Sequence, residues 1–406
     1  MDYDLVFEGG GAKGMVFVGA MQEFEGRGHT YGRLLGTSAG AITAALLAAG
    51  YDAAEMLAAL DEKENGQPVF ATFMSQPGPF TDDDVRKSAT LELLKNFKIP
   101  LLPSFATARL SERVVRWLAR QPQPSHMFSF LERGGWYSAD NFLAWLRGKL
   151  DAGTVNGQAR QFSQMTLKEF YTATRVDLSL VAADTTAGLM LVLNQRSAPE
   201  CPLVWAVRMS MSIPLLWQEV IWEESWGTYL GKTIAGDAIV DGGLLSNFPI
   251  ELFLSDLSSV TKVMGPKKSE HVLGMLIDES LTVKGAAKSP AAKGGFDFGS
   301  LKSVQRIGNL VNTTIGARDK VVVETFKDLV VRLPAKGYAT TEFNMTEERK
   351  DKLVAAGRAA MRVYFQQPEA APRTPEDETA LREIYNNQAK NIISRRRLPS
   401  GEVRGR

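Results

Sequence analysis

The sequence predicts an α/β fold, and three observations support this prediction. Short and nearly all-apolar runs, such as 177–183 and 272–277, are typical of strands that are buried in a sheet. Two further predicted strands, near 3–8 and 33–37, run directly into glycine-rich turns that open helices. Predicted helices separate the remaining strands. The 406 residues are enough for two average domains, but a single α/β domain with insertions also fits this length.

The composition narrows the class of protein. Apolar residues make up 44% of the chain and the net charge is +1, so a large core is expected and nucleic acid is not expected as a partner. The single cysteine, Cys201, allows no intrachain disulfide. No apolar run reaches the roughly 18 residues that cross a bilayer, and no secretory signal precedes the first strand. We therefore expect a cytoplasmic protein, and secretion without a classical signal peptide remains an alternative.

The first turn follows the strand at 3–8 and reads Gly9-Gly10-Gly11-Ala12-Lys13-Gly14. Such a turn exposes several backbone N–H groups in one concave patch that favours an anion. Its Gly-x-Gly-x-x-Gly pattern also occurs in dinucleotide sites, but no acidic residue ends the next strand, which disfavours that alternative. If the two glycine-rich turns share a sheet edge, the amides of Gly10, Gly11 and Ala12 face Ser38 and form an oxyanion hole.

The second turn is Gly36-Thr37-Ser38-Ala39-Gly40, which has the form of a nucleophile elbow. Gly36 and Gly40 are predicted to avoid collisions between a Cβ and the adjacent strand or helix. The Ser38 hydroxyl would project from the turn close to the start of the following helix. The alternative interpretation is a helix N-cap serine between two packing glycines.

A candidate base stands far downstream, where the segment 234–243 is read as a strand that ends in Asp241-Gly242-Gly243. The alternative is an ordinary Asp-Gly turn. Only His126 or His271 could complete a triad in the order serine, aspartate, histidine, and we expect each of these and His29 to be structural or solvated. Without a histidine, Asp241 must accept the Ser38 proton, which a carboxylate can do if burial increases its basicity.

Together these motifs resemble those of the patatin-like phospholipases, and the segment Arg208–Pro214 is similar to the Ser-x-x-x-Pro block of that family. The resemblance is strong over 2–257 and weaker to about 357. It implies a three-layer sandwich with a central, mostly parallel sheet and helices on both faces. It also implies a Ser38–Asp241 dyad, an oxyanion hole at Gly9–Ala12, and hydrolysis of phospholipid acyl esters at a membrane surface. No cofactor is implied, and whether an activator is needed is left open.

The sequence also allows three alternatives to a phospholipase A or lysophospholipase. The first is a general lipid esterase, the second an acyltransferase, and the third a non-catalytic regulator that binds a nucleotide or lipid. Lys13 is expected either to support the glycine turn, to meet a phosphate headgroup or to be a solvated surface lysine. One cysteine and three scattered histidines predict no metal site.

The domain prediction assigns 1–365 to the patatin-like domain and 366–406 to a linker, a helix and a basic tail. Within the domain, 66–136 is rich in proline and aromatic residues and is predicted to be a helical insertion. It serves either as a lid or lipid-entry surface over Ser38 or as a packed helical cap. Other expected elements are a helix at 248–257, a loop at 283–299 and an amphipathic helix within 301–326.

Overall fold

The computed structural model describes residues 1–64, 66–96, 104–286, 325–367 and 375–393. Its centre is an eight-stranded sheet in the order β11-β12-β8-β2-β1-β13-β14, with β9 paired to β8. The five strands from β8 to β14 are parallel, whereas β9 and β12 run antiparallel to β8. The strands are β1 (Asp2–Phe7), β2 (Thr30–Thr37), β8 (Asp177–Asp184), β9 (Leu189–Leu193), β11 (Val220–Ile221), β12 (Ala238–Asp241), β13 (His271–Thr282) and β14 (Val330–Lys336).

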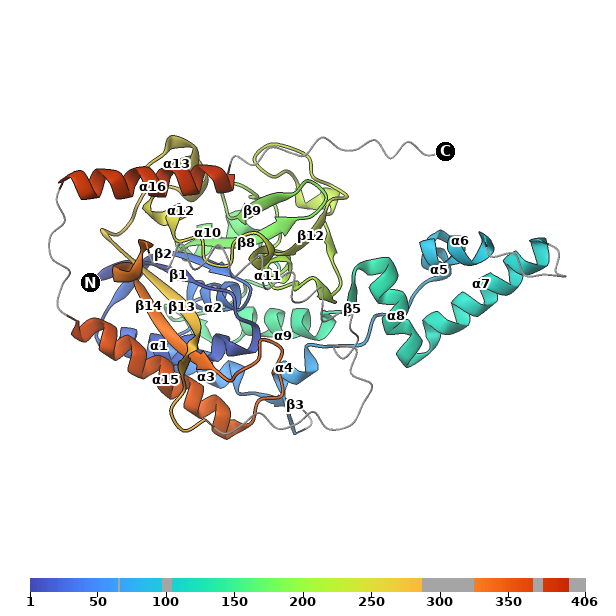
Figure 1. Ribbon diagram of the computed structural model, residues 1–406, viewed down its shortest axis with the longest axis horizontal. Helices are drawn as coiled ribbons and strands as arrows, with labels where there is room; N and C mark the ends of the chain where they lie inside the picture. The colour runs from blue at the N-terminus through green and yellow to red at the C-terminus, as the bar shows by residue number, and fades with distance from the viewer. Residues whose placement is uncertain (65, 97–103, 287–324, 368–374, 394–406) are drawn as a thin grey trace.

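Helices cover both faces of this sheet (Figure 1). Alternate strand residues point to opposite faces, so Leu5 and Phe7 of β1 pack into one hydrophobic cluster and Val6 packs into another. The first cluster includes α1 (Met15–Gly26), α2 (Ala39–Ala48), α3 (Ala53–Leu60), α9 (Asp140–Asp151), α10 (Leu167–Thr174), α11 (Leu203–Ser210) and α15 (Glu347–Gln366). The second includes α12 (Glu251–Leu254), α13 (Ser258–Met264) and α16 (Pro375–Ile393). The predicted α/β sandwich with a mostly parallel sheet is thereby confirmed.

Two of the expected elements differ or cannot be compared. The helix predicted at 248–257 is wrong in extent, because α12 ends at Leu254 and α13 begins at Ser258. Ser255, between them, donates a side-chain hydrogen bond to Asn386 of α16. The predicted loop at 283–299 and helix within 301–326 fall mostly on 287–324, outside the described residues. No helix in the described ranges combines the length and the apolar character needed to span a bilayer.

The predicted insertion at 66–136 has two structurally different parts. Its first part includes α4 (Val69–Thr72), whose Val69 packs into the main core. Its second part is an arm that projects away from the sheet (Figure 1). The arm consists of α5 (Asp82–Lys87), α6 (Ala89–Asn96), α7 (Ser104–Arg120) and α8 (Pro122–Arg133). The remaining short strands are β3 (Lys63–Glu64), β4 (Gln67–Pro68), β5 (Gly135–Tyr137), β6 (Thr154–Val155), β7 (Gln158–Ala159) and β10 (Leu215–Trp217).

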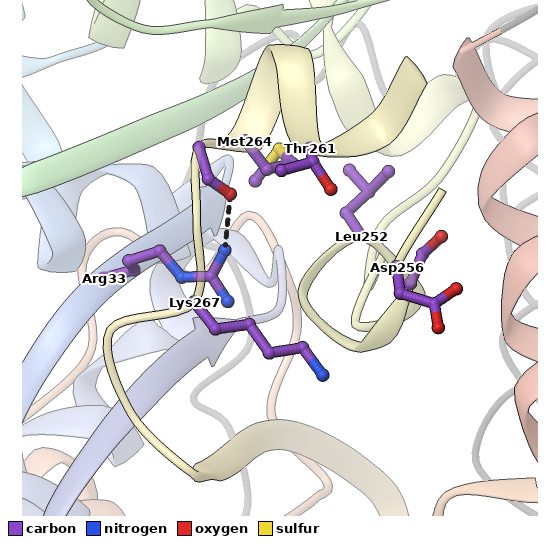
Figure 2. A pocket seen from close by; sticks show the side chains of 8 residues that line it. Arg33, Leu252, Asp256, Thr261, Met264 and Lys267 are labelled. Carbon is purple, nitrogen blue, oxygen red and sulfur yellow. Dashed lines mark hydrogen bonds between the residues drawn. The ribbon is translucent and has the colours of Figure 1, made fainter. Parts of the chain in front are cut away.

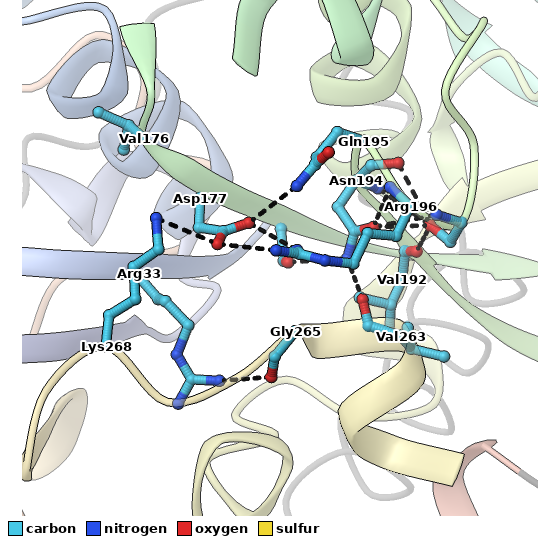
Figure 3. A network of polar contacts seen from close by, with 12 residues as sticks. Arg33, Val176, Asp177, Val192, Asn194, Gln195, Arg196, Val263, Gly265 and Lys268 are labelled. Carbon is cyan, nitrogen blue, oxygen red and sulfur yellow. Dashed lines mark hydrogen bonds and ion pairs between the residues drawn. The ribbon is translucent and has the colours of Figure 1, made fainter. Parts of the chain in front are cut away.

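Buried charges hold together the edge of the sheet where the parallel strands start. Arg33 of β2 forms an ion pair of 2.6 Å with Asp4 of β1, and both side chains are buried. Arg33 also lines a cavity of about 250 Å³ (Figure 2). Beside it, Asp177 of β8 forms ion pairs with Arg196 and Lys268 (Figure 3). This edge is opposite to the one where Ser38 follows the end of β2, so we assign these charges to stability.

Arg33→Met is expected to lower the free energy of unfolding by about 3–5 kcal/mol, because it leaves the Asp4 carboxylate buried without its cation. Urea denaturation at neutral pH measures this loss. Lys63→Met is the matched control, since the Lys63–Glu347 pair is half exposed and such pairs contribute about 0–1 kcal/mol. Equal losses in the two variants would contradict the assignment.

Candidate active site

Ser38 lies in a sharp turn between β2 and α2, with a backbone φ of 54° and ψ of −120°. A positive φ is rare for a residue with a Cβ and is a source of local strain at functional turns. A Cβ on Gly36 would lie 2.3 Å from the Gly40 carbonyl oxygen, and one on Gly40 would lie 2.3 Å from that of Phe7. Both glycines are therefore required by close packing, as the sequence predicted.

The glycine turn follows β1 and lies next to Ser38. A Cβ on Gly9 would lie 3.0 Å from the Cβ of Ser38, so the two turns share one edge of the sheet. Gly11 has φ of 55°, and a Cβ there would lie 2.2 Å from the Thr340 carbonyl oxygen. These contacts explain why the turn tolerates only glycine at both positions.

The four backbone N–H groups of this turn are not equally available to a ligand. The Ala12 N–H donates to the Thr340 carbonyl at 2.9 Å, and the Gly9 N–H donates to the Asn247 carbonyl at 3.3 Å. The N–H groups of Gly10 and Gly11 have no acceptor among the described residues. The predicted oxyanion hole therefore narrows from four amides to those of Gly10 and Gly11.

Asp241 approaches Ser38 from the other side of β8. Asp241 pairs with Ala182 in the antiparallel register of β12, while Thr37 pairs with Val181 in the parallel register of β2. Ser38 follows Thr37 directly, so Ser38 and Asp241 reach the same level of β8 from its two sides. A Cβ on Gly242 would lie 2.5 Å from the Val181 carbonyl oxygen, which explains the glycine after the aspartate.

Burial controls the protonation of Asp241, which is 4% exposed. Burial raises the pKa of this carboxyl to about 7, although hydrogen bonds from the Ser38 side chain and the Gly243 N–H favour the ionised form. The Gly243 N–H donates to Oδ1 at 2.7 Å and fixes the carboxylate. A carboxylate with this pKa that contacts a serine hydroxyl can accept its proton near neutral pH.

The segment 208–214 holds the backbone N–H groups of both residues. Ser210 accepts a hydrogen bond of 3.1 Å from the Ser38 N–H and donates one of 2.6 Å to the Val181 carbonyl. The Ser212 carbonyl accepts a hydrogen bond of 2.9 Å from the Asp241 N–H. The sequence identified this segment only by its resemblance to a family motif, and the structure adds this positioning geometry.

Asn247 and Glu8 were not predicted as part of the site. Asn247 Nδ2 donates to the Gly9 carbonyl at 2.8 Å and to Glu8 Oε1 at 3.1 Å. Glu8 Oε2 accepts a hydrogen bond of 2.6 Å from the Ile277 N–H of β13. These two side chains tie the glycine turn to the segment after Asp241. The signal in the sequence was position, because Glu8 directly precedes the glycine turn and Asn247 follows Gly243 by four residues.

The structure shows the surroundings of Lys13 and of the three histidines. Lys13 is buried and forms an ion pair with Glu279 of β13, so its interpretation as a solvated surface lysine is wrong. His29 and His271 both contact the ring of Tyr3 near the start of β1, away from the end of β2. His126 lies on α8 with Nδ1 2.8 Å from the Trp136 carbonyl oxygen. Over the part of the chain that the structure describes, no group of three or more metal-ligating residues is close enough to hold a metal ion.

The sequence matches a family model for patatin-like phospholipases over residues 5–254, which is more than half of the chain. A known relative is the uncharacterized protein YqhO of Bacillus subtilis (strain 168). It is 25% identical over 374 residues, which make up 90% of this chain and 99% of YqhO.

Two solved structures are more distantly similar. VipD from Legionella pneumophila shows 16% identity with a TM-score of 0.43 over 89% of this chain and 66% of the VipD chain. Full-length ExoU from the type III secretion system of Pseudomonas aeruginosa, in complex with SpcU, shows 16% identity with a TM-score of 0.38. That match covers 96% of this chain and 59% of the other. The chain thus spans less than two thirds of either solved protein.

Proposed function

Because the chain belongs to the patatin-like phospholipase family, a family of lipid acyl hydrolases, we propose that it is a phospholipase A or lysophospholipase. In this proposal it cleaves fatty acyl esters of phospholipids through a Ser38–Asp241 dyad. The observation that supports the dyad most directly is the register of the sheet. Thr37 and Asp241 pair with the adjacent residues Val181 and Ala182 of β8, which brings Ser38 and the buried Asp241 carboxyl to the same level. The two residues are separated by about two hundred positions in the chain, so the fold alone brings them together.

The proposed reaction has two steps. Asp241 takes the proton of Ser38 Oγ as this oxygen attacks the ester carbonyl carbon. The N–H groups of Gly10 and Gly11 stabilise the oxyanion that forms on the carbonyl oxygen. The ester C–O bond then breaks, and the lysophospholipid leaves with the proton from Asp241. A water molecule, deprotonated by the same carboxylate, attacks the acyl-serine carbonyl. The bond to Ser38 Oγ breaks, Asp241 returns the proton to this oxygen, and the fatty acid leaves.

Phosphatidylcholine with a labelled acyl chain tests the reaction class. We expect the wild-type protein to release labelled fatty acid and an equal amount of lysophosphatidylcholine if it is a phospholipase A. A lysophospholipase is expected to release labelled fatty acid from labelled lysophosphatidylcholine instead. Transfer of the label to an added acceptor alcohol without free acid would favour the acyltransferase alternative. Cleavage of a soluble short-chain ester but of no phospholipid would favour the general esterase. Turnover of neither substrate would overturn the proposal and favour a regulator that only binds its ligand.

A further inference from the structure

The arm formed by α5–α8 is a small helical unit with a core of its own. This core is separate from the two clusters of the sandwich and contains Phe80, Val85, Leu91, Val115, Ala119 and Phe128. The base of the arm is closed by Ser75 and Ser138, because the Ser138 N–H donates to the Ser75 carbonyl at 3.2 Å. The arm can therefore keep its shape while it projects from the sheet (Figure 1).

The outer surface of the arm is unusually apolar. Ten large hydrophobic side chains are exposed among the residues whose side chains are described, and half of them lie on this arm. The five are Leu93, Val114, Trp117, Met127 and Leu131. Trp117 is 61% exposed and Leu131 is 58% exposed. An exposed patch of large apolar side chains often marks an interaction site.

Arginine side chains accompany the exposed tryptophan on α7. Arg113 precedes Trp117 by four positions and Arg120 follows it by three, so all three lie on one face of the helix. Both arginines are exposed. The sequence of α7 contains four arginines and a single acidic residue, Glu112. Arg113 forms no ion pair with a described residue, and Arg120 forms only a pair of 3.6 Å with Asp82. This face is thus both cationic and apolar.

We infer that the outer face of α7 and α8, formed by Arg113, Val114, Trp117, Arg120, Met127 and Leu131, docks on an anionic lipid bilayer. This inference rests on the proposed function, which places the substrate in a membrane. A helix that lies in the interface buries aromatic and aliphatic side chains among the lipid headgroups while its arginines meet anionic lipids. Tryptophan is the side chain most enriched at this depth of a membrane, together with tyrosine.

The arm is also connected to the elements that hold the candidate dyad. α8 leads directly into β5, and β5 pairs with β10, where Gly135 is opposite Leu215 and Tyr137 is opposite Trp217. β10 begins three residues after Ser212, whose carbonyl holds the Asp241 N–H. The arm is thus joined through β5 and β10 to the segment that supports Ser38 and Asp241.

Vesicle binding tests the docking face without turnover, if all binding variants carry Ser38→Ala. We expect this protein to co-sediment with vesicles of phosphatidylcholine and phosphatidylserine, and less with vesicles of phosphatidylcholine alone. Trp117→Asp is expected to lower the partition coefficient by about tenfold or more. Arg113→Gln combined with Arg120→Gln is expected to lower it about 25-fold on the anionic vesicles only, at about fivefold per charge.

Val363→Asp is the matched control, because Val363 is 56% exposed on α15 and lies outside the arm. It is expected to bind vesicles as the parent does. Trp117→Phe is expected to retain most of the binding, which separates loss of the docking side chain from unfolding of the arm. Equal binding by the parent and Trp117→Asp would overturn the inference. The inference would also be overturned if Trp117→Asp changed self-association or the binding of a protein and left vesicle binding unchanged.

Hydrolysis of a soluble short-chain ester, measured with Ser38 present, separates this inference from the proposed function. Trp117→Asp is expected to leave that activity unchanged. If the wild-type protein hydrolyses no ester but the vesicle results hold, the proposed function fails and the docking face stands. If ester hydrolysis is present but the vesicle results fail, the docking face is wrong and the proposed function stands.

Discussion

Replacing Ser38 by alanine is expected to lower kcat/KM for acyl-ester hydrolysis by about 10⁴-fold or more. The loss is large because the change removes the attacking oxygen, while substrate binding and the amides of Gly10 and Gly11 are retained. A soluble short-chain ester is the best substrate for this measurement, since membrane binding then makes no contribution. The unfolding temperature should change little, because alanine also fits the small and buried space of Ser38.

Two other serines provide matched controls for this loss. Ser210→Ala removes only the acceptor of the Ser38 N–H and is expected to lower kcat by about tenfold to a hundredfold, through a less well fixed elbow. Ser225→Ala changes an exposed serine in the short helix after β11 and is expected to have no effect. A Ser38→Ala protein that retains activity within tenfold of the wild type would show that another group is the nucleophile.

Replacing Asp241 by asparagine is expected to cause a loss of similar size, about 10⁴-fold in kcat/KM, because asparagine has no basicity. The wild-type activity should also depend on pH through this group. Only the ionised carboxylate can accept the Ser38 proton, and burial raises its pKa to about 7. We therefore expect kcat/KM for the soluble ester to fall tenfold per pH unit below about pH 7 and to level off above it.

The ionisation of Asp241 is expected to affect the stability of the fold in the opposite direction to its effect on activity as pH rises. The carboxyl has a pKa of about 7 in the folded protein and an ordinary value of 3.8 when unfolded. Between these values the folded state holds a proton that the unfolded state has lost, so stability falls as pH rises through this window. Asp241→Asn removes this fall, and the inactive variant should be at least as stable as the wild type at pH 8.

Asp184 is the matched control for the pH profile. It is fully buried at the end of β8, and burial together with the Asp237 carboxyl raises its pKa as well. Asp184→Asn is expected to leave the acid limb of the profile in place. A limb that disappears in Asp184→Asn and persists in the residual activity of Asp241→Asn would contradict the assignment of Asp241 as the base.

Local sequence patterns predicted most of the framework. The two glycine-rich turns, the helices that follow them and the strand end at Asp241 could be predicted because the signals for each lie within a few adjacent residues. Caps and tight turns depend on hydrogen bonds and φ angles of the same segment. The sequence alone therefore predicted Ser38, Asp241 and the glycine turn as the candidate site, but not Glu8 or Asn247.

The incorrect or incomplete predictions concern contacts between distant parts of the chain. The Thr340 carbonyl, which occupies the Ala12 N–H, comes from the loop after β14 and leaves no local signal. Lys13 is paired by Glu279, which lies 266 positions further on. The helix after Asp241 is interrupted where Asn386 contacts Ser255. No periodicity or spacing near these residues encodes such partners, and tertiary structure decides them.

The placement of Ser38 and Asp241 on the two flanks of β8 has a mechanical consequence. Their separation is set by the registers of β2 and β12 on one shared strand, and Ser210 and Ser212 hold the two backbone N–H groups in place. A slip of either strand by one residue along β8 would therefore displace its group by about 3.3 Å and misalign the pair.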